Sequence, residues 1–83
     1  MNYELSQHAR TVMTEREIPL VWLERALHHP ARVEPDRKDA GLLHHLIVVP
    51  EHGNRVLRVV LNNQVAPSRI VTLYFDRRLK GKL

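Results

Sequence analysis

With 83 residues, the chain is near the lower end of the length that can bury one hydrophobic core, which predicts a single domain over residues 1–83. It has no cysteine, so disulfide bonds and thiolate metal sites are excluded, and so small a core must be held together by packing. Thirteen Lys and Arg against nine Asp and Glu give a net charge of +4, which favours anionic partners.

The sequence shows no pattern for secretion or membrane insertion. Residues 1–6 lack the basic and apolar regions of a signal peptide, and apolar runs such as Leu46–Val49 are far too short to cross a bilayer. We therefore expect a cytoplasmic protein without membrane contact.

Two helices are predicted in the first third of the chain. Apolar residues recur at helical spacing behind Ser6, a good N-cap, which predicts a helix over residues 7–15. Pro19 suits the opening turn of a second helix, which would run to about His28 because Pro30 stops it. The second helix has its own apolar stripe: Leu20, Leu23, Ala26 and Leu27.

Beyond Pro30 the pattern is extended. Segments rich in β-branched residues predict strands near residues 31–34, 42–49, 56–61 and 70–75. The turns between them are short, so consecutive strands should be antiparallel. The predicted fold is α+β: two N-terminal helices packed on one face of a four-stranded antiparallel meander sheet, in the order α-α-β-β-β-β.

The face of the sheet away from the helices is expected to be open to solvent. Alternation along the last two strands places Arg58, Thr72 and Tyr74 on it. We expect it also to carry three apolar side chains: Val56, Val60 and Ile70. An uncovered apolar surface favours self-association, which leaves a monomer and a homodimer both open.

The six histidines do not form a metal-binding pattern. The pairs His28-His29 and His44-His45 lack the i, i+4 spacing of helical ligands, and on a strand His44 and His45 would point to opposite faces. His28 and His29 suit the C-terminal end of the second helix, where positive charge is favourable. There is also no glycine-rich phosphate loop, so we expect neither a metal nor a cofactor.

Several polar residues are able to act on RNA without a metal. Cleavage beside a 2′-hydroxyl needs a base, cationic donors for the phosphate and an acid for the leaving oxygen. His8 and Tyr74 are the candidates for proton transfer, and Arg16 and Arg58 for stabilising charge on the phosphate. A structural role is the alternative, because His8 and Arg16 lie about 80° apart around an ideal helix and could simply border its buried side.

Residues 77–83 form a predicted basic tail. Its four cations are candidates for contacts with RNA or a ribosomal surface: Arg77, Arg78, Lys80 and Lys82. A binding module without catalytic activity is therefore the alternative to a ribonuclease.

Six residues at the start of the chain have a characteristic spacing: Ser6, His8, Ala9, Met13, Arg16 and Ile18. This spacing resembles the signature S-x-H-A-x-x-x-M-x-x-R-x-I of the small bacterial family known as domain of unknown function 4258. Residues 57–60 and 70–74 resemble the paired late strands of that family. Val12 stands where the family frequently has Arg, and Glu17 where it frequently has Gly.

The resemblance implies a fold similar to RelE-like toxins and related small ribonucleases, in which N-terminal helices pack on a four-stranded antiparallel sheet. Members of that larger group cleave RNA without a metal, often messenger RNA on the ribosome. A toxin of this type implies an antitoxin as its protein partner.

Overall fold

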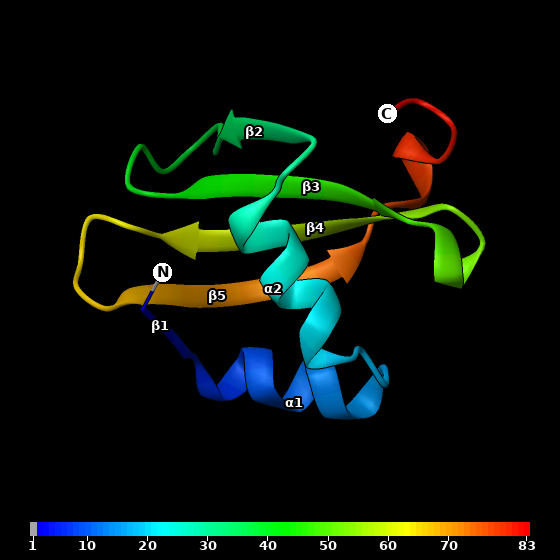
Figure 1. The fold of residues 1–83 in the computed structure, drawn as a ribbon. Coiled ribbons are helices and arrows are strands. Elements are labelled where there is room, and N and C mark those ends of the chain that lie inside the picture. The colour runs from blue at the N-terminus through cyan, green and yellow to red at the C-terminus, as the bar shows by residue number, and fades with distance from the viewer. Residues whose placement is uncertain (1) are drawn as a thin grey trace.

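A computed structural model describes residues 2–83 and shows an α+β fold (Figure 1). Its helices and strands follow in the order β1 (Tyr3–Leu5), α1 (Gln7–Glu15), α2 (Leu20–His28), β2 (Arg32–Pro35), β3 (Leu43–Val49), β4 (Arg55–Asn62) and β5 (Ser68–Phe75). Two short 3-10 helices, η1 (Pro50–His52) and η2 (Arg77–Leu79), follow β3 and β5. Neither α-helix in the described part of the chain is long and apolar enough to cross a membrane.

The sheet is mixed and has five strands in the order β1-β5-β4-β3-β2. Strands β2 to β5 form the predicted antiparallel meander. Strand β1, however, pairs in parallel with β5, so the prediction of four purely antiparallel strands is wrong. Three residues are too few to show alternation, and the partner strand of β1 lies near the other end of the sequence. For these reasons, β1 could not be predicted from the local sequence.

Ser6 joins β1, α1 and β5. Its hydroxyl accepts a hydrogen bond from the backbone N–H of Ala9 at 3.0 Å, as predicted for an N-cap, and donates one to the carbonyl of Val71 at 2.8 Å. The register shifts between Val60 and Leu61, a β-bulge that leaves Val71 opposite no residue of β4. The Ser6 backbone N–H also donates to the Ile70 carbonyl at 3.0 Å, which fixes the start of α1 against the sheet.

Helix α1 ends in a Schellman motif. The N–H of Ile18 donates to the Met13 carbonyl at 2.9 Å, and the N–H of Glu17 donates to the Thr14 carbonyl at 3.3 Å. Glu17 adopts a left-handed conformation with φ of 52°, which glycine adopts without steric conflict. The position therefore favours glycine, and Glu17 occupies it at a steric cost.

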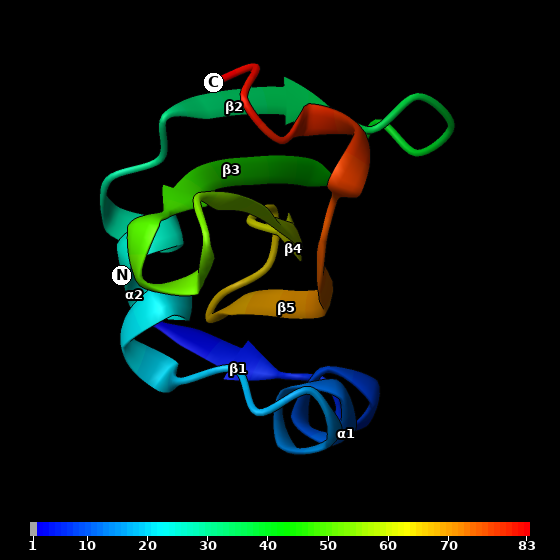
Figure 2. The same ribbon diagram turned by 90° about the vertical axis from the view of Figure 1, so that its right-hand side faces the viewer.

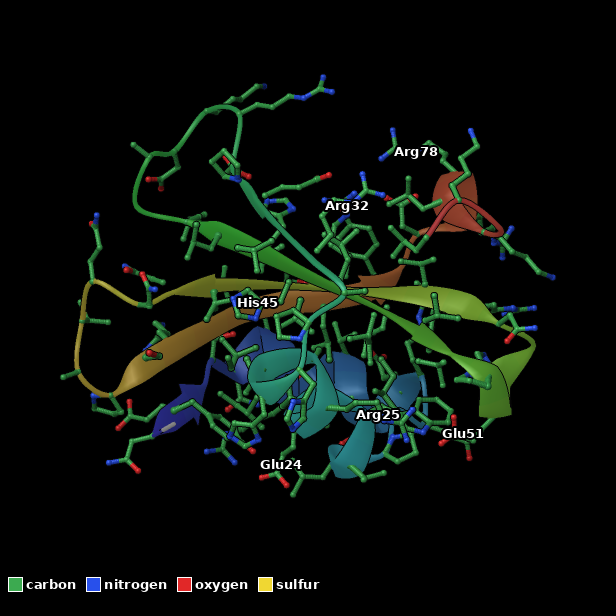
Figure 3. All side chains as sticks on the ribbon, turned by 45° about the horizontal axis from the view of Figure 1, so that its top comes forward. Glu24, Arg25, Arg32, His45, Glu51 and Arg78 are labelled. Atoms are coloured by element: carbon green, nitrogen blue, oxygen red, sulfur yellow. The ribbon has the colours of Figure 1, made fainter. Side chains whose placement is uncertain are left out.

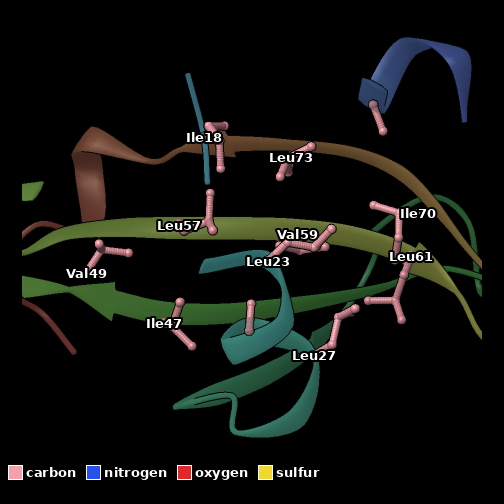
Figure 4. Packing of buried hydrophobic residues seen from close by; sticks show 12 residues of the cluster. Ile18, Leu23, Leu27, Ile47, Val49, Leu57, Val59, Leu61, Ile70 and Leu73 are labelled. Atoms are coloured by element: carbon pink, nitrogen blue, oxygen red, sulfur yellow. The ribbon is translucent and has the colours of Figure 1, made fainter. Parts of the chain in front are cut away.

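The two helices cover different parts of the sheet. Helix α2 packs across one face, over β3 and β4. Helix α1 lies beside β5, near the edge of the sheet that β1 forms (Figure 2). Between the helices and the sheet lies the main core, with Leu23 of α2 against Leu57 and Val59 of β4 (Figure 4). Ala9 and Ile18 extend this core to α1 and the loop that follows it.

The opposite face of the sheet is more covered than predicted. Val56 and Val60 on this face are 1% and 6% exposed, and Ile70 is buried in the main core instead. After β5 the chain turns across this side, where the Asp76 N–H donates to the Val56 carbonyl at 2.8 Å (Figure 2). The expectation of an exposed apolar surface made of these three residues is therefore wrong.

Candidate functional site

A cleft opens on the face of the sheet away from α2, and we call it the central cleft. Its volume is about 330 Å³. Nine residues from β2, the loop after it, β3, β4, β5 and η2 line it: Glu34, Pro35, Asp36, Arg37, Lys38, His44, Arg58, Tyr74 and Arg78. Four of these side chains are cationic and two are carboxylates, so the cleft suits an anionic ligand.

Arg58 forms the floor of the central cleft and is only 9% exposed. Its Nε donates to Asp76 Oδ2 at 3.1 Å, and its Nη1 lies 3.3 Å from Glu34 Oε1 and donates to His44 Nδ1 at 2.8 Å. A buried guanidinium requires such partners, because an unpaired buried charge is costly. The charge of Arg58 is therefore already compensated inside the protein.

His44 bridges Arg58 and the loop after β2. Arginine can only donate, so His44 Nδ1 is the acceptor, and the proton sits on Nε2, 2.7 Å from Asp36 Oδ1. This hydrogen bond, together with those from the backbone N–H groups of Lys38 and Asp39, holds the pKa of Asp36 below its usual value. Both ring nitrogens of His44 are thus engaged in this arrangement.

Asp76 anchors the C-terminal turn and is 3% exposed. Burial alone would raise its pKa, but hydrogen bonds from Arg78 and then Arg58 outweigh burial and hold the pKa below the usual value. Asp76 in turn raises the pKa of Arg78, to which the nearby Tyr74 also contributes. A continuous polar chain therefore runs from Asp36 through His44, Arg58 and Asp76 to Arg78.

The rim of the central cleft is exposed, in contrast to its floor. Arg37 and Lys38 are exposed on the loop after β2, and the Arg78 side chain is 83% exposed. Figure 3 shows Arg78 on the side of the sheet away from α2. Tyr74, 40% exposed, supplies an accessible aromatic ring beside these cations. Such a rim is able to bind phosphates and to stack a base.

The predicted catalytic residues are only partly brought together. Arg58 and Tyr74 are cross-strand neighbours in the cleft, as alternation predicted. His8 is exposed, and its Nε2 lies 3.0 Å from Oγ1 of Thr72, two residues before Tyr74. Arg16 caps the far end of α1, is exposed and does not line the cleft.

The predicted basic tail is divided by η2. Arg78 lines the central cleft, whereas Arg77 and Lys80 line a separate, smaller cleft. Lys82 is exposed beyond the turn. The tail is therefore folded onto β4 at its start and does not project as one arm.

Strand alternation separates the two neighbouring histidines of β3. His44 points into the central cleft, while the Nδ1–H of His45 donates to the Ala26 carbonyl of α2 at 2.9 Å on the other face. Among residues 2–83 there is no group of three or more His, Asp or Glu placed to hold a metal ion.

Sequence reasoning missed three acidic partners in this site: Glu34, Asp36 and Asp76. Glu34 lies opposite His44 in the β2–β3 register, so the hairpin register was the signal that would have located it. Asp36 and Asp76 follow the ends of strands, where the sequence gives no orientation for a side chain.

The fold and the cleft define a small basic α+β protein with a cleft lined by four cationic side chains on one sheet face. Residues 5–75 match the model of the family described as Domain of unknown function (DUF4258), so the chain belongs to this family, as its first helix indicated. No curated protein and no solved structure matches the chain.

Proposed function

We propose that the central cleft binds RNA through its phosphate groups. The observation that carries this proposal is the difference between the floor and the rim: Arg58 is buried and paired, whereas the side chains of Arg37, Lys38 and Arg78 are exposed around the opening. Exposed Arg side chains form strong charge-assisted hydrogen bonds with phosphate oxygens.

Tyr74 favours RNA over a smaller anion. Its exposed ring lies beside the cationic rim, where an unpaired base could stack on it while the neighbouring phosphate meets Arg78. Stacking of this kind contributes about 1–3 kcal/mol per base and tolerates any sequence. The net charge of +4 would also accelerate the encounter with a polyanion.

Binding of fluorescently labelled single-stranded RNA, followed by anisotropy over a series of salt concentrations, tests this proposal. Removing two phosphate contacts should flatten the plot of log affinity against log salt by about 1.4, since each contact contributes about 0.7 for a single strand. The test variant is the double substitution Arg37→Ala and Lys38→Ala. The matched control, Arg10→Ala with Arg69→Ala, removes two exposed charges outside the cleft.

If the two double variants change the salt dependence equally, the cleft is not the binding site. If the wild-type protein does not bind RNA at low salt, the proposal is rejected altogether.

A second candidate function, metal-independent RNA cleavage, is favoured by the position of His8. His8 reaches Thr72 at 3.0 Å, and Thr72 and Tyr74 occupy the same face of β5, so an imidazole and a phenol lie along one path beside the cleft. One would remove the 2′-hydroxyl proton while the other protonates the leaving 5′-oxygen. Because Arg58 is buried whereas the Arg78 side chain is 83% exposed, Arg78 is the better placed cation for the phosphate, and Arg16 lies outside the cleft.

An RNA cleavage assay in EDTA tests the second candidate. We expect products ending in a 2′,3′-cyclic phosphate, and a loss of rate of about 10²–10⁴ on His8→Ala or Tyr74→Phe. Thr11→Ala is the control, because Thr11 is exposed on α1 three residues after His8 and its hydroxyl donates to the Gln7 carbonyl within the helix. Absence of cleavage by the wild type would reject catalysis and leave the binding proposal standing.

The remaining implications of the family resemblance belong to this second candidate: a RelE-like fold, action at the ribosome and an antitoxin partner. Induced expression in a bacterial host should arrest growth with the wild type but not with His8→Ala. Normal growth with both proteins at equal levels would argue against a toxin.

A further inference from the structure

A second cationic cleft lies on the other side of the C-terminal turn, and we call it the tail cleft. It has a volume of about 220 Å³ and is lined by Arg55, Asp76, Arg77 and Lys80. The Asp76 carboxylate already accepts hydrogen bonds from Arg58 and Arg78, so it offers little compensation to the three cations. Like the central cleft, the tail cleft suits an anion.

The three cations of the tail cleft are accessible. Arg55, Arg77 and Lys80 are all exposed. The Arg55 guanidinium makes one long contact, 3.5 Å from His52 Nε2, which leaves most of its donors directed at solvent. A phosphate could bind these side chains without breaking an ion pair.

The geometry of η2 explains why adjacent arginines serve different clefts. A 3-10 helix has about three residues per turn, so Arg77 and Arg78 point about 120° apart. The turn itself cannot rotate freely, because the Asp76 N–H is bonded to Val56 and its carboxylate to Arg58. Arg78 is thereby held in the central cleft and Arg77 in the tail cleft.

We propose that one single strand of RNA occupies both clefts and crosses the C-terminal turn between them. This inference rests on the proposed RNA-binding function and extends it to the path and minimum length of the ligand. Asp76 and η2 separate the clefts, and a single 3-10 turn is only about 6 Å long, so a few nucleotides can bridge it. A path that bends from one cleft to the other suits a flexible single strand better than a stiff duplex.

Linking two weak sites through one ligand has a measurable consequence. A strand that reaches both clefts gains affinity through effective concentration, whereas a strand that fills one cleft does not. Binding of long RNA should therefore be sensitive to the tail cleft, and binding of very short RNA should not.

Anisotropy measurements with labelled single strands of about 3 and about 12 nucleotides test this inference. The tail-cleft variant is Arg55→Ala with Lys80→Ala, and the charge-matched control is again Arg10→Ala with Arg69→Ala. Circular dichroism and thermal melting of each variant confirm that it is folded. Relative to the control, the tail-cleft variant should weaken binding of the long strand about tenfold or more, and of the short strand by no more than about twofold.

The outcomes separate this inference from the proposed function. If the tail-cleft variant weakens binding of the long strand no more than the control does, or weakens both strands equally, the two-cleft path is overturned. If Arg37→Ala with Lys38→Ala still weakens binding in that case, the central cleft remains the RNA site. If neither cleft variant differs from the control, both proposals fail.

Discussion

Glu17 ends α1 in a backbone conformation that suits glycine, with φ of 52°. This conformation costs a residue with a Cβ atom about 1–2 kcal/mol, and glycine avoids that steric cost. Part of the gain is offset because glycine loses more backbone entropy on folding. We therefore predict that Glu17→Gly raises the free energy of unfolding by about 0.5–1 kcal/mol, measured by urea denaturation.

The control for Glu17→Gly is the same type of change inside the helix. Arg10 is exposed within α1, where Gly should lower stability by about 0.5–1 kcal/mol. A loss of stability in both variants would show that the left-handed position does not govern the end of α1.

For single residues, local sequence patterns predicted the face of the sheet to which a side chain points, but not its contact partners. Alternation placed His44 and His45 on opposite faces of the sheet, and the structure confirms it. It also placed Arg58 beside Tyr74. That Arg58 is neutralised by Asp76 depends on how the chain folds back after β5, which no local pattern contains.

Most helices and strands could be predicted from local sequence, but two elements depend on contacts between distant parts of the chain. Both helices were predicted to within about one residue, because a capping serine and two prolines mark their ends. Strands β2 to β5 were predicted from β-branched residues and turns. By contrast, β1 owes its existence to pairing with β5, and η2 to the anchoring of Asp76, so both require the assembled sheet.

An ion pair between two elements gives a pH-dependent prediction. Arg25 of α2 donates to both Glu51 carboxylate oxygens in η1, at 3.1 and 2.7 Å (Figure 3). The hydrogen bond from Arg25, followed by a backbone hydrogen bond, lowers the pKa of Glu51 to about 2 from its ordinary 4.5. Since the folded pKa is the lower one, this stabilisation is present above pH 4.5 and disappears as the pH falls through about 2.

We predict that the melting temperature of the wild type exceeds that of Glu51→Gln at about pH 6, and that the difference shrinks towards zero near pH 2. Differential scanning calorimetry across this range measures it. Glu15→Gln, which removes an exposed carboxylate at the end of α1, is the control. A difference between wild type and Glu51→Gln that is independent of pH would contradict the role of the ion pair.

Across the whole molecule, the hydrogen bonds of Arg58 join parts that are distant in sequence. From β4, its guanidinium reaches Glu34 on β2, His44 on β3 and Asp76 after β5. The main core on the α2 side contains no equivalent, since it is held by apolar packing. Apolar packing thus stabilises the face of the sheet that α2 covers, while a network of hydrogen bonds and ion pairs spans the other face. Only the face with this network forms the candidate site.

The polar network predicts a large loss of stability on Arg58→Met. The unbranched apolar side chain of Met would fill part of the space but leave the carboxylates of Asp76 and Glu34 without their buried partner. Breaking a buried pair from one side typically costs about 3–5 kcal/mol, a large part of the roughly 5–15 kcal/mol that stabilises a small protein. Arg69→Met, on an exposed position of β5, should change stability by less than about 0.5 kcal/mol.

Urea denaturation of the two variants measures the difference, and equal stabilities would mean that the network contributes nothing net. A confirmed loss has a consequence for function. Failure of an Arg58 variant to bind or cleave RNA would then reflect unfolding of the cleft as readily as a lost phosphate contact. The exposed rim side chains outside the network, Arg37 and Lys38, are therefore the ones whose substitution reports on RNA directly.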